Sequence, residues 1–183
     1  MPLEKWQKLS SEVFHGNKWW KGIHDRFRLP NGKEGDYFYM KTPGSVFVFP
    51  IDADEKIILV RQYRYLADKE SLEIVGGGIK PGRSSVDAVR AEMAEEIGIE
   101  AENLEEVGSF EPCNGLISEL SHVFVARSLK PIIDHPDETE EIIIEKYSLD
   151  DFEKRIFSGE IWDGMTLAAW AIAKPYLKNS LIR

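Results

Sequence analysis

The stretch "GGGIKPGRSSVDAVRAEMAEEIGI" at residues 76–99 places three glycines before a segment with the periodicity of a helix. Apolar residues recur at intervals of three and four along that segment, which puts them on one helix face. They are Val86, Val89, Met93 and Ile97. The spacing predicts an amphipathic helix that follows a glycine-rich turn.

The predicted helix has recognisable start and stop signals. Ser84 is an N-cap candidate with Asp87 three residues further on, and Gly98 stops the apolar pattern. The preceding run "SLEIV", residues 71–75, is typical of a strand. We therefore expect a strand, a glycine turn at its end, and a helix between Ser84 and Gly98.

Three glutamates share one face of this helix. Glu92, Glu95 and Glu96 are related as i, i+3 and i+4, and no basic residue stands four places after any of them. Like charges at this spacing destabilise a helix by about 0.2–0.5 kcal/mol per pair. A solvated acidic face is the ordinary explanation. The glycines favour another one, because a glycine turn lets backbone approach a ligand closely, and Mg²⁺ is commonly shared between carboxylates and substrate phosphates.

The rest of the chain is rich in strand candidates. The dipeptide Asn31-Gly32 predicts a hairpin, and "TLAAWAIAKPYL" predicts a terminal helix that ends near Pro175. Because the strands flank one or two helices without regular βαβ alternation, we expect a mixed sheet sandwiched by helices. The strand candidates are residues 19–28, 37–42, 45–51, 56–66, 71–75, 104–111, 120–128 and 142–147.

Composition limits the class of protein. A chain of 183 residues with 43% hydrophobic residues is expected to form one soluble domain, with or without a small appended element. The net charge of -9 argues against a nucleic-acid partner, and apolar runs fall short of the ~20 residues that would span a membrane. The N-terminus lacks the pattern of a secretory signal, and Cys113 is the single cysteine. We expect a cytoplasmic location.

The glycines and glutamates together resemble the box of the Nudix hydrolases, G-x5-E-x7-R-E-U-x-E-E-x-G-U, where U is aliphatic. The chain departs from this box twice: Arg83 stands at the first glutamate, and Ala91 stands at the arginine. Arg90 does not simply replace that arginine, because one step along a helix turns a side chain by about 100°. Arg83 is compatible with substrate binding and equally with an ion pair to Asp87. The matching positions are Gly77, Glu92, Met93, Glu95, Glu96, Gly98 and Ile99.

The resemblance implies an α+β fold, the Nudix-type α/β/α sandwich with a mixed β-sheet, plus an N-terminal antiparallel β-hairpin region. We expect the hairpin region at residues 1–43 and the Nudix hydrolase domain at residues 44–183. The resemblance also implies Mg²⁺ as cofactor, with Mn²⁺ as an alternative. Its ligands would be the Gly76 carbonyl and the carboxylates of Glu92, Glu95 and Glu96.

Further segments are similar to one Nudix branch, the ADP-ribose and nucleoside-diphosphate-sugar pyrophosphatases. They are "ILVRQYRY", "SLEIVGGGI", "PCNGLISE", "DETEE" and "SGEIWDGMTLAAW". Pro112 stands where that branch has a proline after its box. The resemblance implies that a late acidic loop supplies a base or an extra metal ligand, from Glu138 or Glu140, and that Glu96 is a further catalytic candidate. A solvated acidic turn is the alternative for that loop.

The resemblance also implies residues that hold the substrate. Trp19 and Tyr37 would stack on the base as aromatics of the N-terminal hairpin, which in this branch are often supplied by the other subunit of a homodimer. Hairpin packing is the structural alternative for both aromatics. Arg64 matches a phosphate-binding arginine, with Arg61 as the fallback. The remaining candidates near the substrate are Glu73, Arg83 and Glu119.

Together these features predict a pyrophosphohydrolase. Its substrate would be a nucleoside diphosphate linked to X, such as ADP-ribose or a nucleotide sugar, and its products a nucleoside monophosphate and a sugar phosphate. The alternative is a catalytically weak Nudix domain that binds or senses such nucleotides, which the departures at Arg83 and Ala91 would favour.

Overall fold

The computed structural model describes residues 2–132 and 141–178. Its internal contacts divide the chain into two compact units. The first unit comprises Met1–Pro43 together with Glu111–Leu120, and the second comprises Gly44–Phe110 together with Ser121–Arg183. The first unit therefore includes a segment from the middle of the chain as well as the N-terminal region.

The first unit is a four-stranded sheet in the order β1-β2-β3-β8. β1, β2 and β3 pair antiparallel, whereas β8 pairs parallel with β3. The hairpin predicted at Asn31-Gly32 joins β2 to β3, with Gly32 at a left-handed φ of 86°. The strands are β1 (Gln7–Gly16), β2 (Lys21–Arg28), β3 (Glu34–Lys41) and β8 (Ile117–Ser118).

Two details of this unit differ from the expectation. β1 was not predicted, because its sequence "QKLSSEVFHG" is mostly polar and its residues are mostly exposed. Trp19 was expected on a strand, but it lies with Trp20 in the turn between β1 and β2. There the side chain of Asn17 accepts hydrogen bonds from both tryptophan amides, at 2.8 and 3.0 Å.

The second unit contains a six-stranded sheet in the order β10-β5-β6-β4-β9-β7. β4 and β9 pair parallel and every other neighbouring pair is antiparallel, so the sheet is mixed, as predicted. A short 3-10 helix at Tyr65–Ala67 connects β5 to β6. The strands are β4 (Ser45–Pro50), β5 (Lys56–Arg64), β6 (Lys69–Gly78), β7 (Ile99–Phe110), β9 (Ser121–Pro131) and β10 (Ile143–Ser148).

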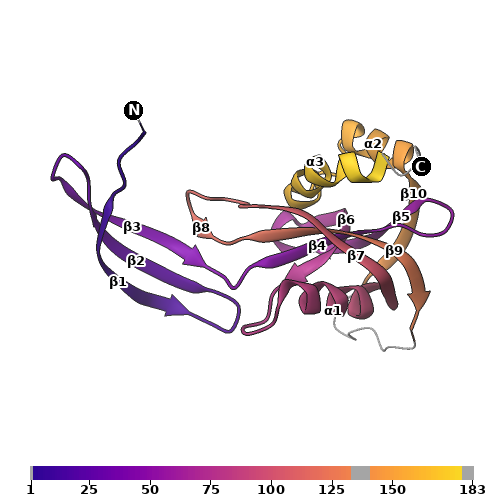
Figure 1. The fold of residues 1–183 in the computed structure, drawn as a ribbon, viewed down its shortest axis with the longest axis horizontal. Coiled ribbons are helices and arrows are strands. Elements are labelled where there is room, and N and C mark those ends of the chain that lie inside the picture. The colour runs from indigo at the N-terminus through magenta and orange to yellow at the C-terminus, as the bar shows by residue number, and fades with distance from the viewer. Residues whose placement is uncertain (1, 133–140, 179–183) are drawn as a thin grey trace. The chain divides into compact units, whose positions relative to one another are not determined.

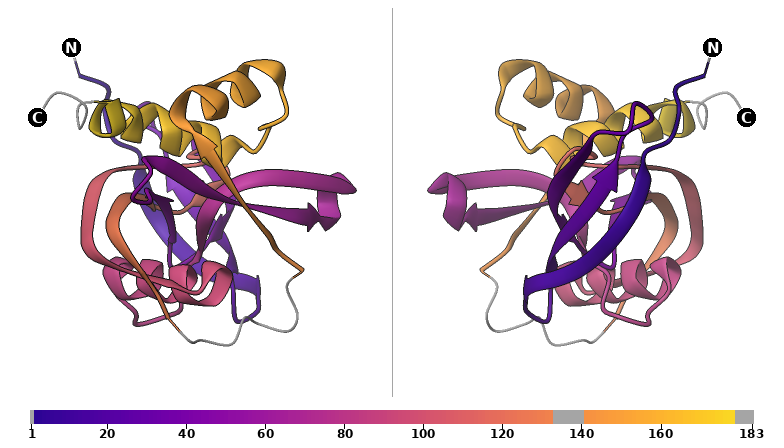
Figure 2. Two further views of the ribbon diagram at one scale, coloured as in Figure 1. Left: turned by 90° about the vertical axis from the view of Figure 1, so that its right-hand side faces the viewer. Right: turned by 90° about the vertical axis from the view of Figure 1, so that its left-hand side faces the viewer.

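Three helices cover the two faces of this sheet (Figure 1). α1 (Ser85–Ile97) packs on one face, and α2 (Leu149–Ser158) and α3 (Gly164–Lys178) pack on the other. Both views of Figure 2 show the same three layers. This arrangement confirms the predicted α/β/α sandwich.

Strand alternation divides the core into two clusters. On the α1 face, the side chains of Val46, Val75 and Phe124 pack against Val89 and Met93 of the helix. On the opposite face, a second cluster surrounds aromatic residues of the sheet and of the two other helices. Its large members are Phe49, Phe152 and Trp170, whose ring centroids lie 5.0–6.0 Å apart. Apolar burial on both faces stabilises the sheet and fixes its register.

α1 begins and ends where the sequence predicted. Ser84 is the N-cap, and its hydroxyl accepts a hydrogen bond from the amide of Asp87. Gly98 is the C-cap with a left-handed φ of 63°. Val86 was expected on the buried face, but it is 43% exposed. Val86 is the second residue of α1 and lies in its first turn, next to the loop that precedes the helix.

The other two helices differ from the prediction. α2 was not predicted, and α3 was expected to end near Pro175 but continues to Lys178. Proline removes one hydrogen bond, to the carbonyl four residues earlier, and here that loss falls in the last turn. Leu177 is fully buried and holds this last turn against the core. None of the described helices has the length and apolar character needed to cross a bilayer.

Candidate active site

The candidate site lies where the last residues of β6 face α1. The three glycines were expected to form a turn, but β6 continues through Gly78. The turn comes later, at Pro81 and Gly82. A side chain at Gly77 would collide with Glu92, since an added Cβ would lie 2.5 Å from its Oε2. The glycine therefore permits a carboxylate to lie directly against the strand.

Gly76 brings a second carboxylate to the same place. Its amide donates a hydrogen bond of 3.2 Å to Oε2 of Glu96, a residue that is 9% exposed. A Cβ at this position would lie 2.4 Å from the carbonyl oxygen of Val46 on β4. Glu92 and Glu96, one helical turn apart, thus both reach the backbone of Gly76 and Gly77.

Glu95 has a different neighbour. Its Oε1 lies 3.7 Å from Nζ of Lys80, which comes from the loop between β6 and α1. The sequence has no basic residue four places after this glutamate, and the loop supplies a basic residue instead. Within residues 2–132 and 141–178, no three His, Cys, Asp or Glu side chains form a ready-made metal cage.

Arg64 is held beside the site by a buried carboxylate. Its guanidinium donates two hydrogen bonds to Glu73, one from Nε at 2.8 Å, and Glu73 is 4% exposed. The pKa of Arg64 is raised, chiefly by this hydrogen bond, against the opposing effect of burial; the charges of Asp163 and Glu96 raise it further. Two sequence candidates, Arg64 and Glu73, are therefore joined in one bidentate ion pair.

Asp163 and Thr166 at the start of α3 belong to the same neighbourhood, and neither was among the site residues expected from the sequence. Oδ2 of Asp163 accepts a hydrogen bond of 2.7 Å from the amide of Thr166, which caps the helix. Oγ1 of Thr166 accepts one of 3.3 Å from the amide of Ile74 on β6. The segment "DGMT" carries the signal, an aspartate three residues before a threonine at the beginning of an apolar run.

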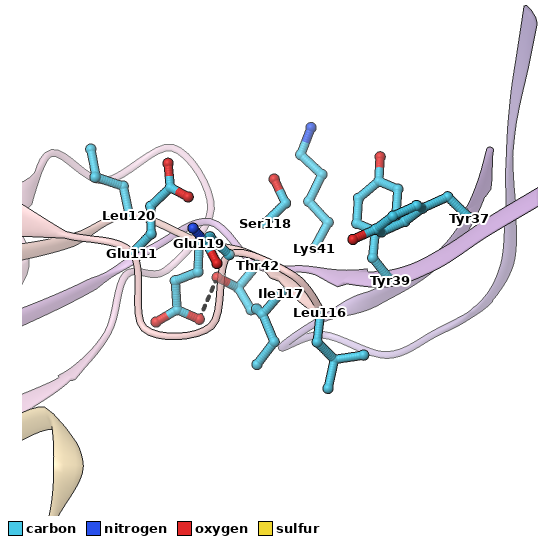
Figure 3. Close-up of a pocket in the computed structure, with 11 residues that line it drawn as sticks. Tyr37, Tyr39, Lys41, Thr42, Glu111, Leu116, Ile117, Ser118, Glu119 and Leu120 are labelled. Carbon is cyan, nitrogen blue, oxygen red and sulfur yellow. Dashed lines mark hydrogen bonds between the residues drawn. The ribbon is translucent and has the colours of Figure 1, made fainter. Parts of the chain in front are cut away.

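The first unit has a pocket of its own, of about 550 Å³, between β3 and residues 111–120 (Figure 3). Tyr37, predicted to stack on a base, lines it and donates a hydrogen bond of 2.7 Å to the carbonyl of Gly115. Glu119, another candidate, accepts one of 2.9 Å from Thr42. Tyr39 also lines the pocket, although it was not among the residues expected there from the sequence.

Other candidates lie apart from these groups. Trp19 does not line the pocket of the first unit, and Nζ of Lys18 lies 4.5 Å from the centroid of its ring. Arg61 donates hydrogen bonds to Glu145 and Glu160, so it ties β5 to β10 and to the segment after α2. The predicted bases Glu138 and Glu140 lie outside the described residues.

The two departures from the box also have defined surroundings. Arg83 is exposed, and the carboxylate of Asp87 accepts a hydrogen bond of 2.7 Å from the hydroxyl of Ser84. Among the described residues no ion pair joins Arg83 to Asp87. Arg90 donates a hydrogen bond of 3.0 Å to the carbonyl of Ala101, away from the glycines.

Comparison with known proteins adds independent evidence. An ADP-ribose pyrophosphatase of Bacillus subtilis (strain 168) is 32% identical over 181 residues, covering 98% of this chain and 96% of its own. A methanol dehydrogenase activator of Bacillus methanolicus is 32% identical over 147 residues, covering 79% and 80%. A crystal structure of an ADP compounds hydrolase shares the fold, with a TM-score of 0.86, 23% identity and 98% of each chain covered.

The family model of the NUDIX domain matches residues 41–164, well over half of the chain. That range contains β6, α1 and the glutamates that face the glycines. The family model and the relative that is 32% identical over 98% of this chain both show the same family, and the solved structure shows the same fold. The chain therefore belongs to the Nudix family.

Proposed function

We propose that the chain hydrolyses the pyrophosphate bond of ADP-ribose or a related nucleotide sugar, giving a nucleoside monophosphate and a sugar phosphate. The observation that carries this proposal is the placement of the Glu92 and Glu96 carboxylates against the backbone of Gly76 and Gly77. In support, the relative from Bacillus subtilis named an ADP-ribose pyrophosphatase matches over nearly the whole chain.

The donor set at the glycines fits a divalent cation, which we propose to be Mg²⁺. Magnesium is usually bound by one or two carboxylates together with waters and substrate phosphates, so a cage of three side chains is unnecessary. Glu92, Glu96 and the Gly76 carbonyl would hold it, with Glu95 as a further ligand once released from Lys80. When bound, the ion would polarise phosphate oxygens and lower the pKa of the attacking water.

The protein's own groups then position the substrate. Arg64, fixed by Glu73, would hold a phosphate of the substrate by charge-assisted hydrogen bonds. In the hydrolysis one water oxygen bonds to phosphorus, the bond from that phosphorus to the bridging oxygen breaks, and a base takes the proton. We propose Glu138 or Glu140 for that base.

The base of the nucleotide would bind in the first unit. Tyr37 presents an aromatic ring in the pocket of about 550 Å³ there, and Glu119 adds an acceptor. Aromatic rings can stack on a purine, while a carboxylate can accept from its amino group. We propose that Trp19 contributes from the second subunit of a homodimer.

Product formation from ADP-ribose tests the proposal. With Mg²⁺ present, the wild-type chain should release AMP and ribose 5-phosphate, and Glu92→Gln should lower kcat at least about 100-fold, or ~2.7 kcal/mol of transition-state stabilisation. Glu105→Gln is a matched control, because Glu105 is exposed on β7. Mg²⁺ should also raise the melting temperature of the wild type but not of Glu92→Gln. Binding of ADP-ribose without turnover in the wild type would instead indicate a sensing domain.

A further inference from the structure

A second hollow, of about 560 Å³, lies beside the first half of α1 in the second unit. Both departures from the Nudix box face it, although they are eight positions apart in the sequence. Its lining consists of Lys80, Pro81, Gly82, Arg83, Asp87 and Ala91. The substitutions at positions 83 and 91 therefore affect one and the same place.

A tight turn fixes the two basic residues of this hollow. The amide of Arg83 donates a hydrogen bond of 3.0 Å to the carbonyl of Lys80. Between them, Pro81 has a restricted φ, and Gly82 has a φ of 81°, as a type II turn requires. Lys80 and Arg83 thus stand at the two ends of a turn with little conformational freedom.

The guanidinium of Arg83 lacks an ion-pair partner among the described residues. Of the six lining residues Asp87 is acidic, and its carboxylate accepts a hydrogen bond of 2.7 Å from the hydroxyl of Ser84. Within residues 2–132 and 141–178, the ion pair of Lys80 is the long contact of 3.7 Å to Glu95. An anion entering the hollow would therefore meet two cations that are not tightly neutralised.

The box pattern has glutamate and arginine at the two departing positions. Since positions 83 and 91 line one hollow, these opposite charges would face each other across it. In this chain Arg83 stands at the glutamate position of the box, and Ala91, whose side chain is a methyl group, stands at the arginine position. Arg83 therefore inverts the charge on its side of the hollow, and the short side chain of Ala91 leaves space on its side.

We propose that this hollow is an anion subsite, formed by Arg83 and Lys80, for a phosphate on the X group of the substrate. The inference rests on the proposed function. Ala91 lies one helical turn, roughly 6 Å along the axis, before Glu95. A phosphate bound in the hollow is therefore close enough to be part of the same substrate molecule whose diphosphate lies at the glutamates. The favoured substrate class is a nucleoside diphosphate linked to a phosphorylated sugar.

Two substrates that differ by one phosphate test this inference. ADP-ribose is compared with ADP-ribose that carries a further phosphate on its terminal ribose, for wild type, Arg83→Gln and Arg83→Glu. We expect Arg83→Gln to lower kcat/KM about tenfold for the phosphorylated substrate and less than about twofold for ADP-ribose. Arg83→Glu, which restores the box residue, should lower it further. Lys56→Gln, an exposed lysine at the start of β5, is the control and should change neither value.

Binding without turnover separates this inference from the proposed function. In EDTA, calorimetry should show that the wild type binds the phosphorylated compound more tightly than ADP-ribose, and that Arg83→Gln removes the difference while Arg83→Lys keeps part of it. Equal affinity of the wild type for both compounds, or equal loss for both in Arg83→Gln, would overturn the subsite. Absence of ADP-ribose hydrolysis, by contrast, would count against the proposed function alone.

Discussion

The amide of Gly76 donates a hydrogen bond of 3.2 Å to the carboxylate of Glu96, twenty residues further along the chain. One residue later, Gly77 lies against the carboxylate of Glu92. Two successive backbone positions of β6 thus set the positions of two glutamates one helical turn apart. The strand acts as a template for the carboxylates, so small changes in its backbone should affect activity more than stability.

Gly77→Ala should displace Glu92. The added Cβ would lie 2.5–2.8 Å from all three atoms of the carboxyl group, which is the mobile end of its side chain, so the chain should still fold. We expect kcat on ADP-ribose to fall at least about tenfold, because a carboxylate held in the wrong place cannot contribute to transition-state stabilisation. Gly78→Ala is the matched control, because a Cβ there meets nothing within 4 Å. Equal activity of both variants would contradict the template role of Gly77.

Much of this arrangement could be predicted from the sequence, because its signals are local. The caps at Ser84 and Gly98 and the i, i+3, i+4 spacing of the glutamates depend on a few neighbouring residues. The position of β6 at the glycines could not be read in the same way. Whether a run of glycines forms a turn or a strand depends on whether another strand pairs with it. Here β4 pairs with Gly76, Gly77 and Gly78.

The elements that were missed show two different causes. α2 had its signals in the sequence, with Ser148 as N-cap, Asp151 three residues later and Gly159 at the end. Those signals were overlooked. β1 had none, since its pairing with β2 is set by tertiary structure rather than by alternation. Likewise, Lys80 meets Glu95 only because the loop folds back, a contact without a sequence signature.

Glu73→Gln should weaken substrate binding through Arg64. Glu73 is 4% exposed and accepts two hydrogen bonds from the guanidinium, whereas glutamine has a single acceptor and no charge. With Arg64 free to rotate, we expect KM for ADP-ribose to rise roughly tenfold while kcat changes less. Steady-state kinetics measure both. Glu70→Gln, on an exposed position of the same strand, should leave both constants unchanged, and a similar rise there would contradict the assignment.

Thr166→Val should loosen the contact between α3 and β6. Oγ1 of Thr166 is the acceptor for the amide of Ile74, and Thr166 is 1% exposed. Valine keeps the shape but leaves a buried amide without this partner, which costs about 1–3 kcal/mol. Urea denaturation should show that loss in the free energy of unfolding. Thr166→Ser retains the hydroxyl and should lose less, and an equally large loss in both variants would show that packing, rather than the hydrogen bond, matters.

The pH dependence of stability should reveal the contribution of the charged side chain of His24, in the first unit. Its Nδ1 lies 2.8 Å from Glu12 of β1 and its Nε2 lies 2.7 Å from Asp36 of β3, so the charged imidazole links three strands. Hydrogen bonds to Glu12 and then Asp36 raise its pKa above the ordinary value of 6.5. Folding therefore favours the protonated form, and the stabilisation is complete below the unfolded pKa and lost as pH rises through the folded one.

His24→Gln should reduce this dependence of stability on pH. Thermal unfolding of the wild type, followed by spectroscopic signals of the first unit, should show a melting temperature that falls as pH rises above about 6.5, whereas the variant's should vary less over the same interval. Lowering the salt concentration should strengthen the wild-type effect, because Glu12 and Asp36 are exposed and their attraction is screened. Parallel curves for wild type and variant would mean that the imidazole bridges the strands without contributing to stability through its charge.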